Sequence, residues 1–104
     1  MSDYRTKKLE NLEYHSEKRA MERFGIKLDR EARFAIHGMI HEGQTRLIQK
    51  RSLRRSIHEL TYEGKLIHVV YDHKRHSLVT FLMPGWSDDE YHQSVRRYEN
   101  GEEV

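Results

Sequence analysis

The chain contains no cysteine, one proline and no long apolar run. Without cysteine there can be no disulfide and no thiolate metal ligand, which fits a reducing compartment. The opening fifteen residues, MSDYRTKKLENLEYH, lack the apolar stretch of a secretory signal. No segment is apolar over the ~20 residues that cross a bilayer. We therefore expect a cytoplasmic protein that does not enter the membrane.

A length of 104 residues predicts one domain with a small core. Charged residues make up 35% of the chain and apolar residues 36%, but the apolar positions recur with helix and strand periods, which argues against disorder. We expect residues 1–85 to form the α+β body, and residues 86–104 to form an acidic helix and tail of the same domain.

The net charge of +2 is unevenly distributed along the chain. Residues 1–85 carry 17 Lys or Arg and 11 Asp or Glu, whereas residues 86–104 carry 2 and 6. A basic body with an acidic tail favours a polyanionic partner for the body. The alternative is a solvated charged surface whose counter-charge lies in the same chain.

Two helices are predicted from the spacing of the apolar residues in the N-terminal part. The first runs from about Asp3 to Phe24 and ends at Gly25. The second follows Asp29 as its N-cap and stops at Gly43. Because the connection is short, we expect the two helices to be roughly antiparallel neighbours.

After residue 43 the period of the apolar positions changes to two, which predicts antiparallel strands. Four strands are expected, at Gln44–Ser52, Arg54–Tyr62, Lys65–Asp72 and Ser77–Met83. Residues 62–65, Tyr-Glu-Gly-Lys, form a two-residue hairpin signal. The nearly continuous apolar run of the third strand predicts a central strand that is buried on both faces.

The C-terminal helix has a clear start signal. Ser87 and Glu90 form a capping box, and Trp86 before it can pack on Tyr91. The predicted fold is therefore α+β: two N-terminal helices packed on a four-stranded antiparallel sheet, plus a short C-terminal helix.

His15, Arg19 and Arg23 recur at every fourth position of the first predicted helix, so they form one row beside its apolar stripe. Histidine can act as a general acid or base near neutral pH, and arginine can clamp a phosphate. Cleavage of RNA by its own 2′-hydroxyl needs both kinds of group. The alternative is a solvated basic helix face.

The chain has eight histidines, and some of them are spaced in ways that could carry chemistry. His37 and His41 have the spacing of a shared metal ligand pair, but no glutamate follows the first and no third ligand is evident. We expect no metal and no cofactor. His58 and His68 lie in the hairpin strands at positions that could be cross-strand neighbours. If their face is the functional one, His68 becomes a site candidate, together with Lys65 and Thr80.

Basic residues concentrate in the first two predicted strands, with aromatic residues on the same sheet. They are Arg46, Lys50, Arg51, Arg54 and Arg55, and no acidic residue interrupts them. Basic and aromatic side chains together suit single-stranded or looped RNA. Alternatively, these arginines and lysines protect an edge strand from pairing with another chain.

The order of elements, and two stretches of sequence, resemble the RelE/ParE-like toxins, including the BrnT-like group and phage-borne relatives. The stretches are HSEKRAMERFGI, residues 15–26, and YEGKLIHVVYD, residues 62–72, followed by SLVTFL, residues 77–82. The resemblance implies helices on one side of a compact sheet and a concave basic face on the other. It also implies metal-independent RNA cleavage, often on the ribosome, and a cognate antitoxin as a partner.

Carried over to this sequence, the resemblance implies His15, Arg19 and Tyr71 as catalytic candidates. Arg23, Arg46 and Lys65 would contact RNA, together with the basic residues of the first two strands. The sequence departs from the family after the last strand: members often carry a functional aromatic residue or histidine there, whereas this chain has Met-Pro-Gly-Trp at 83–86 and an acidic helix.

Three functions follow from these features, in a fixed order of preference. The first is a small metal-independent endoribonuclease that acts on RNA or the ribosome. The second is a non-catalytic phage-type inhibitor or regulator of a host protein or nucleoprotein, with Trp86, Tyr91 and Tyr98 as its partner-binding residues. A DNA-binding regulator comes last, because the second helix offers His37 and His41 where a recognition helix would carry Arg, Asn or Gln.

Overall fold

The computed structural model describes residues 16–100, except for the side chains of Tyr98 and Asn100. The first helix is described over residues 16–24. It is followed by α2 (Arg30–His41), β1 (Arg46–Lys50), β2 (Arg55–Tyr62), β3 (Lys65–Asp72), β4 (Ser77–Leu82) and α3 (Asp88–Asn100). The strands form one antiparallel sheet in the order β1-β2-β3-β4. The α+β fold predicted from the sequence is confirmed.

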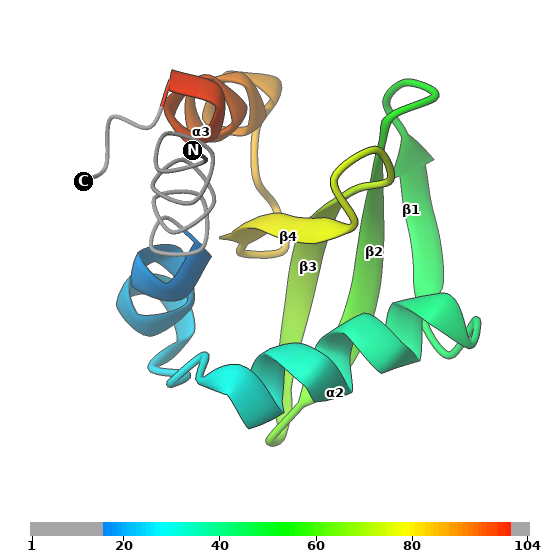
Figure 1. Cartoon of the computed structure of the whole chain (residues 1–104). Helices are drawn as coiled ribbons and strands as arrows, with labels where there is room; N and C mark the ends of the chain where they lie inside the picture. Colours follow the sequence, from blue (N-terminus) through cyan, green and yellow to red (C-terminus); the bar gives the residue numbers. More distant parts are fainter. Residues whose placement is uncertain (1–15, 101–104) are drawn as a thin grey trace, which may run out of the picture.

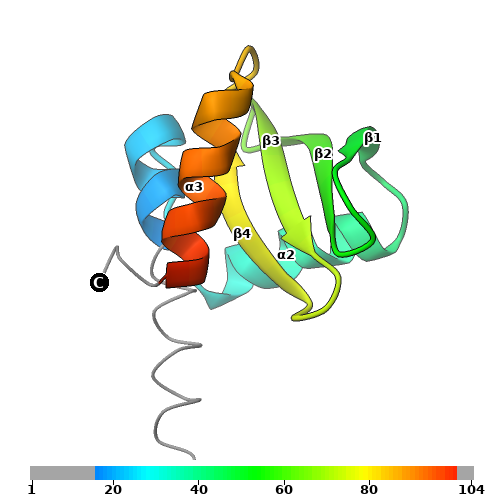
Figure 2. The same ribbon diagram turned by 90° about the horizontal axis from the view of Figure 1, so that it is seen from above.

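The sheet lies between helices, with α2 across one face and α3 across the other (Figure 1). On the α2 side the core contains residues of α2, of β2–β4 and of the first helix, including Ile36, Ile67 and Phe81. On the α3 side, Tyr91 and Val95 cover a second apolar cluster of the sheet. Viewed from above, α3 runs over the β4 side of the sheet (Figure 2). The β4 side of the face that the resemblance implies to be open is therefore covered by α3.

The ends of α2 are set by its sequence. The Asp29 carboxylate accepts a hydrogen bond from the Ala32 amide at 2.8 Å, which caps the N-terminus as predicted. At the C-terminus, Gly43 has a φ of +71°. The amides of Gly43 and Gln44 donate to carbonyls of the last turn, at 3.3 and 2.9 Å, in a Schellman motif.

The hairpin between β2 and β3 has the predicted register, with Tyr62 opposite Lys65. Glu63 and Gly64 have φ angles of 52° and 77°, as a type I′ turn requires. The first strand is shorter than predicted. The amides of Arg51 and Ser52 both donate to the Arg55 carbonyl, which turns the chain out of the sheet after β1.

The segment before α3 is fixed to the sheet through His68. The Trp86 indole donates to His68 Nδ1 at 2.9 Å, and His68 Nε2 lies 2.9 Å from a Glu59 carboxylate oxygen. Because an indole N–H can only donate, His68 carries its proton on Nε2 and donates it to Glu59. The predicted capping box is confirmed, since Ser87 and Glu90 exchange two hydrogen bonds of 3.2 Å.

The expected pairing of His58 with His68 across the hairpin is wrong. The register places His58 opposite Val69 and His68 opposite Glu59. A shift of one residue moves a side chain to the other face of the sheet, so His58 faces α2 and His68 faces α3. Within residues 16–100, no helix combines the length and the apolar character needed to cross a bilayer.

Candidate active site

The row of basic residues predicted on the first helix is used for packing where the structure describes it. His15 lies outside the described residues. Arg19 is 6% exposed and forms an ion pair with Glu22. Arg23 donates to the Phe81 carbonyl at 2.7 Å, and burial, followed by the nearby Arg19 charge, lowers its pKa. Arg23 therefore attaches the first helix to β4, and Arg19 is buried in an ion pair within its own helix, so neither lines an open groove.

The predicted RNA-binding residues are distributed over several surfaces. Arg46 and Lys50 of β1 are exposed, and so is Lys65 at the far hairpin. Arg51, Arg54 and Arg55 each form an ion pair with a carboxylate, from Asp88, Asp72 and Glu99 respectively. Of the remaining sequence candidates on the sheet, His68 and Thr80 are buried on the α3 side.

Two of the three aromatic residues predicted to bind a partner belong to the core. Tyr91 is buried and Trp86 is half-buried, and both belong to the apolar cluster under α3. Their rings are 6.1 Å apart, as the predicted contact between them requires. The side chain of Tyr98 lies outside the described part of the structure. The available aromatic surface therefore gives no support for a partner site on α3.

A row of hydrogen-bonded hydroxyl and imidazole groups lies on the α2 side of the sheet. Ser56 Oγ is 2.8 Å from His58 Nε2 and 2.7 Å from His73 Nε2. The other ring nitrogen of His58, Nδ1, is 2.9 Å from Thr45 Oγ1. A serine hydroxyl donates one proton and accepts others, so Ser56 can pass a proton between the two imidazoles.

Strand geometry explains why these residues meet. Ser56 and His58 are two positions apart on β2, and Tyr71 and His73 have the same spacing at the end of β3. Side chains two positions apart point to the same face, and Ser56 pairs with Tyr71 across the strands. The His73 amide extends the ladder by donating to the Arg54 carbonyl at 2.7 Å.

Tyr71 connects this row of hydrogen-bonded side chains to a histidine of α2. Its hydroxyl is 2.9 Å from His37 Nε2, and its ring has edge contacts with the rings of His37 and His73 at 5.2 and 4.9 Å. His37 Nε2 also lies 3.2 Å from the His76 carbonyl. The ring of His41, one turn further along α2, is 4.9 Å from His37. Three elements thus contribute to one cluster.

The environment keeps two of these imidazoles neutral near pH 7. Burial lowers the pKa of His58, and the neighbouring His73 adds to the effect. Burial also lowers the pKa of His37; the His76 carbonyl opposes this and the His41 ring adds to it. Burial, followed by the Asp72 charge, raises the pKa of Tyr71, so its hydroxyl stays protonated. The cluster therefore holds neutral bases beside a hydroxyl donor.

Folding stability is expected to decrease below neutral pH because of these histidines. An unfolded histidine titrates near 6.5, whereas folded His37 and His58 take up protons only at lower pH. Their contribution is complete above pH 6.5 and is lost as the pH falls through the folded pKa values. Urea unfolding of the His58→Gln variant, measured from pH 7.5 to 5, should give a shallower pH dependence than the wild type. The exposed His92→Gln serves as the control. Equal slopes for wild type and His58→Gln would contradict this prediction.

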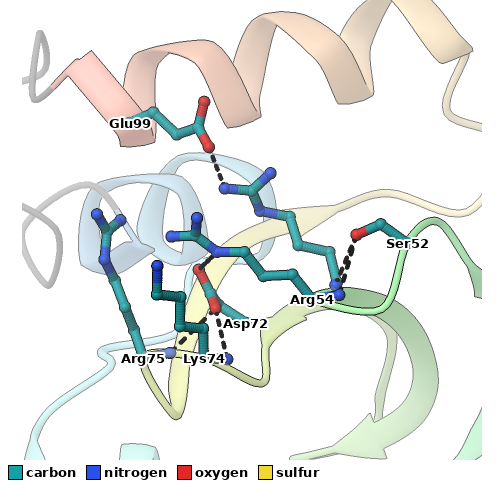
Figure 3. A network of polar contacts seen from close by, with 7 residues as sticks. Ser52, Arg54, Asp72, Lys74, Arg75 and Glu99 are labelled. Atoms are coloured by element: carbon teal, nitrogen blue, oxygen red, sulfur yellow. Dashed lines mark hydrogen bonds and ion pairs between the residues drawn. The ribbon is translucent and has the colours of Figure 1, made fainter.

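A buried carboxylate organises the loops beside the cluster (Figure 3). Asp72, which is 0% exposed, accepts from Arg54 Nε at 2.9 Å and from the amides of Lys74 and Arg75 at 2.9 and 3.0 Å. Burial opposes its ionisation, but these hydrogen bonds, with that of the Arg75 amide the strongest, bring its pKa below the usual value. Asp72 thereby holds the Arg54 side chain and fixes the turn that follows His73.

The same loops carry further polar contacts. The Ser52 hydroxyl accepts from the amides of Arg54 and Arg55, at 3.1 and 3.0 Å, and Arg55 pairs with Glu99 of α3 (Figure 3). In the described part of the chain, no three His, Asp or Glu side chains are grouped as a metal site requires.

Comparison with known proteins adds no relative: no protein-family model, no curated protein and no solved structure matches the chain. The candidate site therefore depends on the geometry of this chain. Thr45, Ser56 and His73 were not found as site residues from the sequence. The sequence signal that could have pointed to this site is the spacing of two residues in both Ser56-x-His58 and Tyr71-x-His73. This spacing places four polar side chains on one face once the strands pair in register.

Proposed function

We propose that the protein is a metal-independent endoribonuclease whose acid and base groups are histidines of this cluster. The observation that carries the proposal is the arrangement of His73. Its imidazole belongs to an exposed residue, it is linked through Ser56 to the neutral His58, and the next residue in the turn is the basic Lys74. RNA cleavage needs this combination of proton transfer and phosphate neutralisation.

In the proposed reaction, one imidazole acts as the base and another acts as the acid. His37, kept neutral by burial, takes the proton of the 2′-hydroxyl while the 2′ oxygen attacks phosphorus. The bond from phosphorus to the 5′ oxygen breaks, and His73 gives that oxygen a proton. The products are a 2′,3′-cyclic phosphate and a 5′-hydroxyl. His37 has then gained the proton that His73 has lost, and exchange with solvent restores both.

The row of hydrogen-bonded side chains next to His73 supports its role as the acid. After His73 has given up its Nδ1 proton, its Nε2 still contacts the Ser56 hydroxyl. Ser56 in turn contacts His58 Nε2, and His58 Nδ1 contacts the Thr45 hydroxyl. The exposed Lys74, the next residue in the turn, is the basic side chain proposed to contact the phosphate. Arginine and lysine stabilise the extra negative charge of the transition state.

The resemblance to the RelE/ParE-like toxins adds support at the level of the fold, because the order of helices and strands agrees with it. The proposed residues differ from those carried over with the resemblance, except for Tyr71. Fold alone does not decide function, so the proposal depends on the histidines.

A second candidate is the non-catalytic inhibitor or regulator, and one observation favours it. Leu53 is 90% exposed in the loop between the basic residues Arg51 and Arg54. An exposed leucine with arginines on both sides suits an interface with an acidic protein or a nucleoprotein. This reading predicts stoichiometric binding without turnover.

The two candidates are separated by an RNA cleavage assay in EDTA with substrate in large excess over protein. Many turnovers, and products that end in a 2′,3′-cyclic phosphate, are expected for the enzyme. An oligonucleotide with a single ribose among deoxyriboses should be cut at that position only. Because the pKa of His37 is lowered, the rate should stay high below pH 6.5 before it decreases. Binding without any cleavage would reject the enzyme in favour of the inhibitor.

A further inference from the structure

A separate hollow lies on the α3 side of the sheet, between α3 and the loop that joins β1 to β2. Its volume is about 400 Å³, within the range of small-ligand pockets. It is lined by Arg51, Ser52, Arg55, Tyr91, His92, Val95, Arg96 and Glu99. None of these residues belongs to the histidine cluster, which faces α2.

One wall of the hollow is a guanidinium group in a fixed position. Arg51 lies over the Tyr91 ring, with its central carbon 4.2 Å from the ring centroid. The same group donates to Gln49 at 2.8 Å and to Asp88 at 3.1 Å. An arginine stacked on an aromatic ring and held on two sides loses little freedom when it binds a ligand.

Arg55, which lines the hollow, has an unused donor. The Arg55 side chain is only 13% exposed, and one of its terminal nitrogens pairs with Glu99. Its Nε–H is buried and, within the described residues, has no hydrogen-bond partner. A buried charged donor without an acceptor is costly, so an acceptor that enters the hollow would gain this hydrogen bond.

The charge of the hollow also favours an anion. Three guanidinium groups line it, and since Arg51 pairs with Asp88 and Arg55 pairs with Glu99, Arg96 supplies the excess positive charge. Arg96 is exposed and has no ion-pair partner in the part of the chain that the structure describes. We infer that the hollow binds a phosphate group, supplied either by a mononucleotide or by the backbone of an RNA strand. The inference is independent of the proposed cleavage, because it uses none of the same residues.

The test is a titration of the ¹⁵N-labelled protein at low salt, followed by the amide signals of Ser52 and His92. The probes are 5′-AMP, adenosine and a 2′-O-methyl octanucleotide without terminal phosphates, which cannot be cleaved. We expect shifts with 5′-AMP, with the octanucleotide, or with both, and none with adenosine. Binding of 5′-AMP alone would identify a terminal phosphate as the ligand, and binding of the octanucleotide would identify the backbone.

Variants on α3 assign the binding to this hollow. Arg96→Ala should weaken binding by about fivefold to tenfold, the usual size of one charge-assisted contact at a partly open position. Glu99→Gln removes the competing carboxylate and should strengthen binding. Arg97→Ala, an exposed arginine one position away, is the matched control and should bind as the wild type does. Equal binding by all four proteins, equal shifts with adenosine and 5′-AMP, or shifts confined to other residues would overturn the inference.

Discussion

Replacement of His73 by alanine is expected to slow RNA cleavage by about 10²- to 10⁴-fold, the usual contribution of one general acid or base. His73 is exposed, and its main structural bond is made by its amide, which the substitution retains. The free energy of unfolding should therefore change by less than about 1 kcal/mol. The measurement is single-turnover cleavage of a short RNA in EDTA, with urea unfolding of the same preparations.

The matched control is His76→Asn in the same turn. His76 is exposed and has a φ of 52°, which asparagine tolerates better than most residues, and its own imidazole has no proposed role. Ser56→Ala should give an intermediate rate, because it interrupts the link to His58 but leaves the His73 ring in place. If His73→Ala and His76→Asn cleave at the same rate, the assignment of His73 is wrong.

The fold could be predicted well because its signals are local. Asp29 as an N-cap, the turn at Glu63 and Gly64, and the Ser87 capping box each depend on a few neighbouring residues. The nearly continuous apolar run of β3 predicted that this strand is buried on both faces, and six of its eight residues are buried. Such features follow from dihedral preferences and short-range hydrogen bonds, which the sequence shows directly.

The candidate site could be predicted only in part, because it depends on the pairing of distant segments. The sequence singled out His37 and His58, but the register that brings Ser56 beside Tyr71 is a property of the paired strands. The position of α2 over that face is a property of the core. Spacing alone also suggested a functional row for Arg19 and Arg23, whereas Arg19 is buried beside Glu22 of its own helix and Arg23 donates to the Phe81 carbonyl of β4.

The role of the acidic helix illustrates the same limit. The excess of negative charge after residue 85 was visible, and the structure shows where two of the carboxylates lie: Asp88 contacts Arg51 and Glu99 contacts Arg55. Tyr91 and Val95 of the same helix fill the core. Removal of residues 86–104 would therefore expose the sheet and destabilise the protein, so a truncation cannot separate binding from folding.

Replacement of Asp72 by asparagine is expected to cost about 3 kcal/mol of folding free energy, a large part of the 5–15 kcal/mol typical of a domain. The asparagine oxygen can still accept from the amides of Lys74 and Arg75, so the turn is kept. Its NH₂ group, however, meets Arg54 Nε–H, and two donors then face each other at a buried position. Urea unfolding at pH 7, with the exposed Asp89→Asn as control, measures the difference.

The pH dependence shows whether the charge of Asp72 causes the loss. The folded pKa lies below the ordinary 3.8, so the contribution of Asp72 is complete above that value and disappears as the pH falls through the folded pKa. The wild type and Asp72→Asn should therefore converge in stability below pH 4. Arg54→Met in the Asp72→Asn background should cost less than in the wild type, because the arginine has already lost its partner. A constant difference down to pH 2, together with additive costs, would show that Asp72 acts through its shape alone. Convergence would instead show that the charge of Asp72 stabilises this end of the sheet, where it holds Arg54 and the turn that follows His73.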